Sequence, residues 1–571
     1  MLRITIAQIN PTIGDLEGNV MLMLRAARQA RHDDAQVVVF PEMSLTAYHP
    51  GDLLEEPLFA QRLRVGLESL LQASREVPQL AWVVGAPVPS PGPGKRLHNA
   101  LLVIRDGQIV KTYAKQLLPT YGVFDDRRHF EPGPDKACVL TVGGVHIGLM
   151  ICEDGWNDDG LDYLANPFSR MAEAAPDLVV SINASPSNIG KREQRHQVFR
   201  KACARHGLPL LYVNQVGGHD QLVYDGASFA MDATGQPVFE ARRFAEDITT
   251  LAFDRGSGRF FGRAGETLPA VPAEGLCTLE FYRRQVVLGL RDYARRCGFS
   301  RVVVGCSGGI DSALTLALAV EALGPQHVVA LTMPSRFSSE GSVRDSVALC
   351  CNLGIALLEH PIGDIVRAFE EGFPPATGGS TLQGLPLENL QARVRGTILM
   401  AYSNAFGHLL LTTGNKSETS VGYCTLYGDT NGGLNLIGDL LKTEVFALSR
   451  HLNDSTGHEV IPQAILDKAP SAELAPNQKD SDSLPPYEVL DEILRHDIEG
   501  LDRLPHGERG RCEAAMAHLL STPDGLQTVQ RVRQLIARSE YKRRQAPPII
   551  RLRPRAFGAG RQMPIAAVHG R

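Results

Sequence analysis

The chain has 571 residues, which is too long for one hydrophobic core and predicts about two to four domains. Its 43% apolar and 21% charged residues are typical of a globular protein, and its net charge of −5 argues against nucleic acid or a membrane surface as a partner. No apolar run is long enough to span a bilayer. The start, Met1–Ala7, alternates like a strand and not like a signal peptide, and the ten cysteines form no C-x-x-C pair, so we expect a reduced, cytoplasmic protein.

Residues 1–262 alternate short β-branched runs with longer amphipathic stretches. The stretch Asn19–His32 has apolar residues at helical spacing and comes just before the strand-like run Val37–Phe40. Further strand-like runs follow at Trp82–Gly85, Ile147–Ile151, Leu178–Ser181 and Leu210–Val213. This alternation predicts a layered α/β domain.

Residues 263–277 are rich in Pro, Gly and small side chains without periodicity, which indicates a linker. A second α/β pattern occupies residues 278–571: a helix near 278–296, a strand at Arg301–Gly305, a helix at Asp311–Leu323 and a strand at Val328–Thr332. Strand, helix, strand favours a parallel sheet with right-handed crossovers. The segments Pro374–Leu387 and Ala469–Tyr487 are interpreted as long loops, either functional or disordered.

Three segments of the first domain place a reactive residue type directly after a strand: Phe40–Tyr48, Tyr113–Gly122 and Leu149–Trp156. Ligands of open α/β folds bind at such strand ends. A free thiol is only a few per cent thiolate at neutral pH, so Cys152 would need a base, and the Glu42 carboxylate could take its proton. Lys115 and a backbone N–H could stabilise the oxyanion formed on an amide. Taken singly, such a cysteine is more often a packing residue and such a lysine a surface charge.

Together the three segments resemble the nitrilase superfamily, whose members carry a Glu-Lys-Cys triad in this order, over roughly the first 260 residues. The resemblance implies an α-β-β-α sandwich with Glu42 as the base, Lys115 as the oxyanion stabiliser and Cys152 as the nucleophile. It also implies a glutamine site that includes Tyr48, Tyr121, Glu153, Ser185, Lys191 and Arg192. Related glutamine-using members often have Asp-Glu where this chain has Asp125-Asp126, so an auxiliary acid role there stays open.

The run Val302–Ser312 leads from an apolar strand through Ser-Gly-Gly into a helix. Glycines let backbone N–H groups approach an anion, and the helix N-terminus adds partial positive charge. The chain lacks the G-x-x-x-x-G-K-[ST] pattern of the common P-loop. The plainer interpretation is a Gly-Gly turn that caps a helix with Asp311 as an acidic first-turn residue. The full S-G-G-x-D-S pattern resembles the PP-loop ATP pyrophosphatases, which implies a Rossmann-like parallel-sheet domain that adenylates a carboxylate.

Downstream segments narrow this resemblance: Leu411–Glu418, Gly422–Asp429, Asn431–Gly433, Gly438–Thr443 and Lys542–Pro548. With the PP-loop they are similar to the glutamine-dependent NAD synthetases over essentially the whole chain. The resemblance implies ATP contacts at Gly305, Ser307, Gly308, Gly309, Asp311, Ser312, Arg393 and Thr413. It implies deamido-NAD contacts at Lys416, Glu418, Asp429, Lys442 and Lys542, and Mg²⁺ ligands at Asp311, Glu418 and, more weakly, Thr443. Each of these residues, taken singly, could also be a surface charge or a helix cap.

The implied substrates are glutamine, ATP and deamido-NAD, and the implied assembly is a homo-oligomer with paired synthetase domains. Because free ammonia is mostly protonated at neutral pH, we expect a dry channel to join the two sites. Three alternatives stay open. The amidase half could be a degenerate scaffold, with the enzyme using free ammonia. The chain could be another amide-forming PP-loop enzyme, such as a relative of asparagine or GMP synthetase. Finally, it could be a binding module without catalysis.

Overall fold

The structure is a computed structural model, which describes residues 1–476 and 478–567. The chain divides into two compact units. The first comprises Met1–Gly217 and Val223–Gly275, and the second comprises Gly218–Leu222 and the chain from Leu276 onward. Both units are mixed α/β structures, as the sequence predicts. Within the described residues, none of the helices combines the length and the apolar character that a membrane crossing requires.

Two β-sheets form the centre of the first unit. The first has the strand order β15-β14-β1-β2-β3-β4-β5, with bounds Leu2–Gln8 (β1), Val37–Val39 (β2), Ala81–Pro89 (β3), Leu97–Arg105 (β4), Gln108–Ala114 (β5), Asp247–Asp254 (β14) and Arg259–Gly262 (β15). The second has the order β13-β12-β9-β8-β7-β6, with bounds Val139–Val142 (β6), Val145–Ile151 (β7), Leu178–Asn183 (β8), Leu210–Asn214 (β9), Phe229–Met231 (β12) and Pro237–Glu240 (β13). A hairpin, Val216–His219 (β10) and Leu222–Asp225 (β11), is separate.

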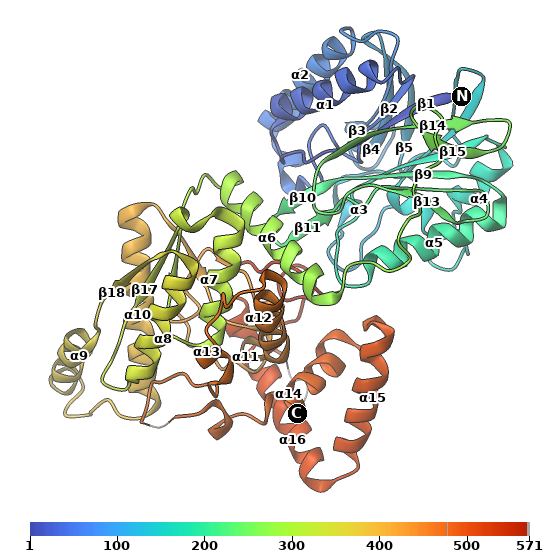
Figure 1. Ribbon diagram of the computed structural model, residues 1–571. Coiled ribbons are helices and arrows are strands. Elements are labelled where there is room, and N and C mark those ends of the chain that lie inside the picture. Colours follow the sequence, from blue (N-terminus) through green and yellow to red (C-terminus); the bar gives the residue numbers. More distant parts are fainter. Residues whose placement is uncertain (477, 568–571) are drawn as a thin grey trace. The chain divides into compact units, whose positions relative to one another are not determined.

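The strand residues alternate between two apolar layers. In β7, Ile147, Leu149 and Ile151 join the core shared by both sheets, whereas Met150 packs with Phe199 of the flanking helix. Period-two alternation explains this split, because successive side chains point to opposite faces of a strand. Helices α1 and α2 lie along one outer face and α4 and α5 along the other, which gives the predicted α-β-β-α sandwich (Figure 1).

The helical segments of the first unit follow the same order along the chain. Asp15 accepts a hydrogen bond from the backbone N–H of Gly18 and so caps the N-terminus of α1, which begins earlier than the sequence pattern predicts. The bounds are Leu16–His32 (α1), Gly51–Glu55 (η1), Pro57–Ser74 (α2), Asp126–His129 (α3), Cys152–Gly155 (η2), Pro167–Glu173 (α4) and Lys191–His206 (α5).

The second unit is built on one parallel sheet with the order β18-β17-β16-β19-β20. Its strands are Val302–Gly305 (β16), Val328–Thr332 (β17), Ala356–Glu359 (β18), Leu409–Thr412 (β19) and Leu434–Asn435 (β20). From β16 the chain first builds outward to β18 and then returns to add β19 on the other side. The boundary between β16 and β19 is therefore the topological switch point, where α/β folds bind ligands.

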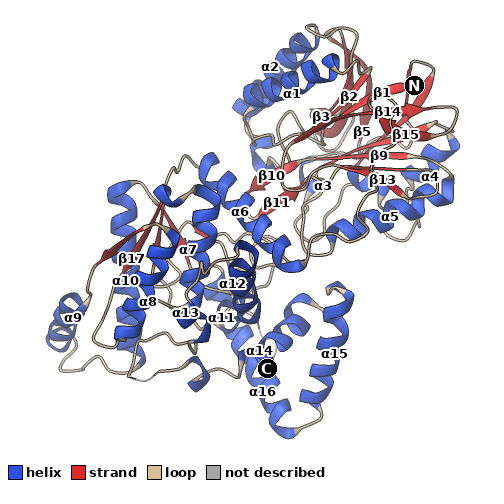
Figure 2. Cartoon of the chain, viewed as in Figure 1, coloured by secondary structure: helices blue, strands red, loops and turns tan. Residues whose placement is uncertain are grey.

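Helices surround this sheet, and a helical layer without strands ends the unit (Figure 2). That layer has its own apolar core, which includes Leu490, Ile493, Val529 and Val532. The helices are Thr278–Arg296 (α6), Ile310–Leu323 (α7), Pro325–His327 (η3), Glu340–Leu353 (α8), Gly363–Ala376 (α9), Leu385–Phe406 (α10), Lys416–Val421 (α11), Lys442–Thr456 (α12), Gln463–Asp467 (α13), Asp480–Asp482 (η4), Tyr487–Leu494 (α14), the π-helical turn Arg495–Glu499 (η5), Leu501–Arg503 (η6), His506–Leu520 (α15), Pro523–Arg538 (α16) and Glu540–Arg543 (α17).

The two expected long loops are shorter than the sequence suggests. Helix α9 continues through Pro374 and Pro375, and α10 begins at Leu385, so only residues 377–384 connect the two helices. Pro386 fits there because the backbone N–H groups of the first helical turn have no intrahelical acceptor, so the N–H that proline lacks costs no hydrogen bond. The segment 469–487 includes the short turn η4 and the first residue of α14, and position 477 lies outside the described residues.

A buried ion-pair cluster holds the C-terminal tail against three other segments of the second unit. The guanidinium of Arg553 donates to Glu444 of α12 at 2.6 Å and to Glu499 at 2.7 Å, and it also pairs with Glu508 of α15. Its side chain is fully buried. Three carboxylates that face one cation would repel one another if the cation were removed.

We therefore predict that Arg553→Met destabilises the second unit by about 3–5 kcal/mol, because it removes the cation that the three carboxylates of this buried cluster share and leaves them, among the described residues, only Lys416 and Arg495 as cationic partners. The measurement is the denaturant midpoint of that unit, followed by a probe placed in it. Arg509→Met is the matched control, since Arg509 pairs with Glu513 on the surface at 3.0 Å and such pairs contribute only about 0–1 kcal/mol. Equal effects of the two substitutions would contradict the prediction.

Candidate active sites

The three reactive residues of the first unit come together at strand ends. Glu42 follows β2, Lys115 follows β5 and Cys152 follows β7. The ammonium of Lys115 donates to Glu42 Oε1 at 2.8 Å, and both side chains are almost fully buried. The charges of Glu42 and Lys115 both act on the Cys152 thiol, which is itself buried. Glu42, Lys115 and Cys152, which lie far apart in the sequence, therefore form one cluster.

Backbone geometry fixes the direction of the Glu42 carboxylate. Its Oε1 also accepts a hydrogen bond from Asn99 Nδ2 at 2.7 Å, and its Oε2 accepts one from the backbone N–H of Ala184 at 3.1 Å. Gly85 of β3 lies so close that a Cβ there would come within 2.1 Å of the Met43 nitrogen. Glycine is needed at that position because any side chain would push the segment that carries Glu42 away from the sheet.

Cys152 lies in a strained turn with a φ of +42°, between β7 and the short helix η2. Residues in that left-handed region cluster at functional sites, where the surrounding structure holds them. Burial and the nearby Glu42 carboxylate raise the pKa of the thiol, so it is protonated in the resting protein. Burial lowers the pKa of Lys115, but the Asp126 and Glu42 carboxylates outweigh that effect and raise it overall. Lys115 therefore stays an ammonium and cannot accept the thiol proton.

Asp126 is a site residue that the sequence left unassigned. Its Oδ2 accepts from Lys115 at 2.8 Å, and its Oδ1 accepts from the Tyr48 hydroxyl at 2.8 Å. The side chain is fully buried, whereas its neighbour Asp125 is exposed. Of the pair Asp125-Asp126, it is therefore Asp126 that contacts Lys115. Its side chain is shorter than the glutamate that related members often have there, but it still reaches the ammonium.

The other residues expected at this site have different surroundings. The Glu153 carboxylate accepts from the hydroxyls of Tyr121 at 3.0 Å and Tyr163 at 2.9 Å, and burial raises its pKa. Tyr163 was not anticipated because it lies in an irregular segment without a motif. Arg192 is paired with Glu240 at 2.8 Å, the Lys191 ammonium lies 3.9 Å from the centre of the Trp156 ring, and the Ser185 hydroxyl accepts from Arg195 at 3.1 Å.

A cavity of about 350 Å³ opens at the switch point of the second unit. The glycine loop after β16 forms one wall, and Gly308 has a φ of +73°. A Cβ on Gly308 would come within 2.3 Å of the Ser342 carbonyl oxygen, so only glycine fits. The residues expected from the sequence that line this cavity are Gly305, Ser307, Gly308, Gly309, Asp311, Ser312, Thr413, Glu418, Asp429, Lys442 and Lys542.

Two carboxylates of this cavity converge on one cation. The Lys442 ammonium donates to Asp311 Oδ2 at 2.6 Å and to Glu418 Oε1 at 2.9 Å. Burial and the nearby Asp311 raise the pKa of Glu418 to about 7, although Lys442 acts in the opposite direction. Carboxylate oxygens are the ligands that Mg²⁺ prefers, so Asp311 and Glu418, which both line the cavity, are the residues that could hold a divalent cation there.

Three expected residues do not line the cavity. Arg393 is exposed and donates to the Leu426 carbonyl at 3.2 Å. Lys416 is fully buried between Asp439 and Glu499, at 2.8 Å from each. The Thr443 hydroxyl donates to Asp491 at 2.7 Å.

Arg395, Lys468 and Glu473 do line the cavity, but the sequence interpretation did not include them. Lys468 donates to the Ser342 hydroxyl at 2.8 Å, and the Glu473 carboxylate accepts from that hydroxyl at 2.6 Å. For Lys468 and Glu473 the clue in the sequence was two charged residues, one just before and one inside the segment 469–487, which was interpreted as a loop.

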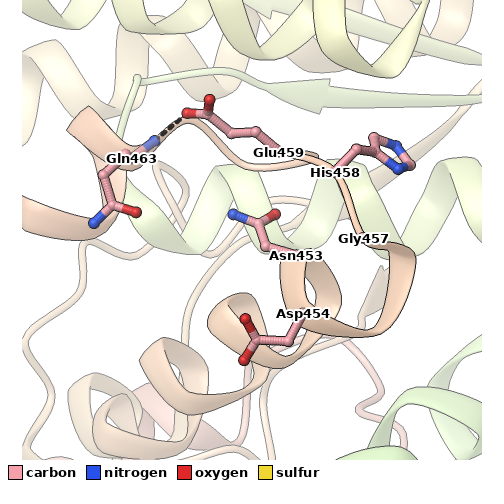
Figure 3. Close-up of a pocket in the computed structure, with 6 residues that line it drawn as sticks. All are labelled: Asn453, Asp454, Gly457, His458, Glu459 and Gln463. Atoms are coloured by element: carbon pink, nitrogen blue, oxygen red, sulfur yellow. Dashed lines mark hydrogen bonds between the residues drawn. The ribbon is translucent and has the colours of Figure 1, made fainter.

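A second hollow in the same unit lies at the end of α12 and is lined by residues of that helix, of the loop after it and of the start of α13, most of them exposed (Figure 3). Glu459 accepts a hydrogen bond there from the Gln463 backbone N–H at 2.5 Å. Asn453 binds the same loop through the backbone of Val460 and Ile461. These side chains stabilise the turn after the helix, and the hollow contains none of the expected site residues.

Comparisons with known proteins match both units. The carbon-nitrogen hydrolase family matches residues 3–262, and the NAD synthase family matches residues 282–546. A glutamine-dependent NAD(+) synthetase of Synechocystis is 42% identical, with 99% of each chain covered. One from Thermotoga maritima is 37% identical over 99% of this chain and 98% of the relative.

A solved structure of a glutamine-dependent NAD+ synthetase from Acinetobacter baumannii, in complex with adenosine diphosphate, has 36% sequence identity and a TM-score of 0.76. The match covers 99% of this chain and 98% of that one. Full-length similarity at this level extends across both units and both candidate sites. The chain therefore belongs to the family of glutamine-dependent NAD(+) synthetases.

Proposed function

We propose that this chain is a cytoplasmic enzyme that makes NAD by amidating the nicotinate carboxylate of deamido-NAD, with ammonia from glutamine and energy from ATP. The observation that carries the proposal is that one chain holds two complete sets of reactive groups. The first unit has a buried thiol beside a carboxylate and an ammonium, and the second has a glycine loop and paired carboxylates around a cavity. Neither set alone accounts for a chain that matches its relatives along its full length.

In the first unit, the Glu42 carboxylate takes the thiol proton of Cys152 as the sulfur attacks the carboxamide carbon of glutamine. The Lys115 ammonium stabilises the oxyanion that forms. Glu42 then gives that proton to the nitrogen of the tetrahedral intermediate, the C–N bond breaks, and ammonia departs and leaves a thioester on Cys152. Glu42 takes a proton from water, whose oxygen attacks the thioester; the C–S bond breaks, glutamate leaves, and the proton returns to the sulfur. Lys115 stays charged throughout, because Asp126 still pairs with it while Glu42 holds a proton.

Recognition of glutamine is assigned to Glu153 and the two tyrosines that donate to it. A buried carboxylate of this kind suits the α-ammonium group of an amino acid, because it lacks a cationic partner among its hydrogen bonds from the described residues. Tyr121 and Tyr163 fix the two oxygens in place. The roles of Ser185, Lys191 and Arg192 in closing over glutamine stay predictions.

In the second unit, the nicotinate carboxylate attacks the α-phosphorus of ATP, which forms an adenylate and releases pyrophosphate. Backbone N–H groups of the loop Ser307–Gly309 and the N-terminus of α7 suit the departing pyrophosphate. Mg²⁺, held by Asp311 and Glu418, would offset the negative charge of the phosphates. Ammonia then attacks the activated carbonyl carbon, loses a proton and displaces AMP, which yields NAD.

The nitrogen source separates the two sites. Cys152→Ala should abolish NAD formation with glutamine and leave NAD formation with ammonium unchanged, because the second unit needs only ammonia. The measurement is the rate of NAD formation from deamido-NAD and ATP with each nitrogen source. Cys138→Ala, a partly buried cysteine outside the cluster, is the control.

Glutamine-driven activity that survives Cys152→Ala would remove Cys152 as the nucleophile. If the wild type forms NAD with ammonium but not with glutamine, the first unit is a degenerate scaffold. If the wild type forms no NAD from either nitrogen source, the chain acts on another carboxylate, as asparagine and GMP synthetases do.

Metal removal tests the cation assignment. Chelation of divalent cations with EDTA should stop NAD formation with ammonium and leave basal glutamine hydrolysis in place, because only the second unit uses the cation.

Glu418→Gln should raise the Mg²⁺ concentration needed for half-maximal NAD formation by about tenfold or more, since it removes one anionic ligand. Thr443→Val is the comparison, because its hydroxyl is bonded to Asp491. A larger effect of Thr443→Val than of Glu418→Gln would refute the ligand set.

We further propose that the synthetase domains pair in a homo-oligomer. Exposed apolar side chains on α9 and α10 support this, notably Phe369 at 53% and Phe406 at 63% exposure. Light scattering during gel filtration should give a mass at least twice that of one chain, and Phe406→Glu tests whether this surface is the one covered. A monomer at micromolar concentration would contradict the proposal.

A further inference from the structure

Arg395 lies on α10, a helix that packs against both strands flanking the switch point, β16 and β19. Its side chain lines the cavity beside Gly305 and Met333. Its Nε donates to the Met333 carbonyl at 3.1 Å, at the end of β17. That contact uses one of the five N–H donors of the guanidinium.

Arg395 is half-buried, and its charge is not balanced in the way that the charges of three fully buried cations of this unit are. Lys416, Lys442 and Arg553 each have two or more carboxylates in direct contact. Among the described residues, none forms an ion pair with Arg395, and burial lowers its pKa to about 10. At neutral pH it is therefore still a cation, and partial burial of a cation without an anion in contact is unfavourable.

Glu473 is the carboxylate that acts on Arg395 through space, but its oxygens are used elsewhere. Its Oε1 accepts hydrogen bonds from the hydroxyls of Ser339 at 3.0 Å and Ser342 at 2.6 Å, and its Oε2 accepts one from the Ser339 backbone N–H at 3.3 Å, at the N-terminus of α8. Because Arg395 lines the cavity, an anion bound there is the partner that its guanidinium can reach. Both substrates of the proposed reaction supply anionic oxygens: ATP through its phosphates, and the dinucleotide through its pyrophosphate and carboxylate.

We propose that Arg395 is a substrate-binding residue whose guanidinium pairs with anionic oxygens of ATP or of the dinucleotide. The planar fork of an arginine matches phosphate and carboxylate groups in two-point contacts that lysine cannot make. The assignment rests on the proposed function, and it concerns a residue two positions from Arg393, which does not line the cavity.

The test uses full-length Arg395→Gln, Arg395→Lys and Arg395→Ala with ammonium as the nitrogen source. Initial rates are measured with ATP and deamido-NAD varied separately. Arg395→Gln should lower kcat/KM for one of the two substrates about tenfold to a hundredfold, and the substrate affected identifies the anion. Arg395→Lys should recover only part of that loss. Added guanidinium should restore activity to Arg395→Ala, an effect that a purely structural role would not give.

Arg450→Gln is the matched control, because Arg450 is an exposed arginine on α12 that lies over the Phe446 ring. Calorimetric titration of wild type and Arg395→Gln with ATP and with deamido-NAD separates a failure of the proposed function from a failure of the Arg395 assignment. If the wild type forms no NAD, the proposed function fails, yet a weaker affinity of Arg395→Gln for either ligand still supports the site. Equal affinities for both ligands, with unchanged kinetics or with activity lost only through a lower Tm, would overturn it.

Discussion

The structure depends on how it buries positive charge. Three lysines in its interior each lie between two carboxylates: Lys115 between Glu42 and Asp126, Lys442 between Asp311 and Glu418, and Lys416 between Asp439 and Glu499. An ammonium can leave water only if such partners replace its hydration. Because the partners come from different segments, each cluster also fixes the relative positions of the elements that supply them.

The same arrangement serves different ends in the three clusters. Around Lys115 it leaves a cation next to a protonated thiol, so Lys115 cannot take the thiol proton and we propose Glu42 as the base. Around Lys442 it brings two carboxylates to the wall of a cavity, and we propose that they hold a metal ion there. Lys416 lies outside the cavity, and its cluster joins α11 to the chain around residues 439 and 499. The local chemistry is the same in the three clusters, since each places an ammonium between two carboxylates. The clusters differ in what lies beside them: a thiol at Lys115, a cavity at Lys442 and, among the described residues, neither at Lys416.

Part of the fold and of the sites could be predicted from the sequence, and part could not. Strand-like runs and the glycine loop follow from local patterns, since period-two alternation and a strand-to-helix turn are encoded over a few residues. The assignment of Glu42, Lys115 and Cys152 to one triad came from the resemblance of three segments to the nitrilase superfamily, because each residue taken singly has a plainer interpretation. The Asp126 contact, the separation of Lys416 from the cavity and the antiparallel pairing of β14 with β1 depend on residues far apart in the chain. No short stretch of the sequence contains that information. The loop expected to begin at Pro374 was wrong for another reason, because α9 includes Pro374 and Pro375 in its last turn.

The pair Arg393 and Arg395 shows the limit most clearly. Both belong to the run Gln391–Arg395, and both are arginines in a region expected to bind substrate. On an α-helix, residues two apart point in nearly opposite directions, so one of them must face away from whatever the other contacts. Choosing between them requires the orientation of α10, which its packing on β16 and β19 sets. That packing exposes Arg393 and places Arg395 in the cavity wall, where no carboxylate of the described residues contacts its guanidinium.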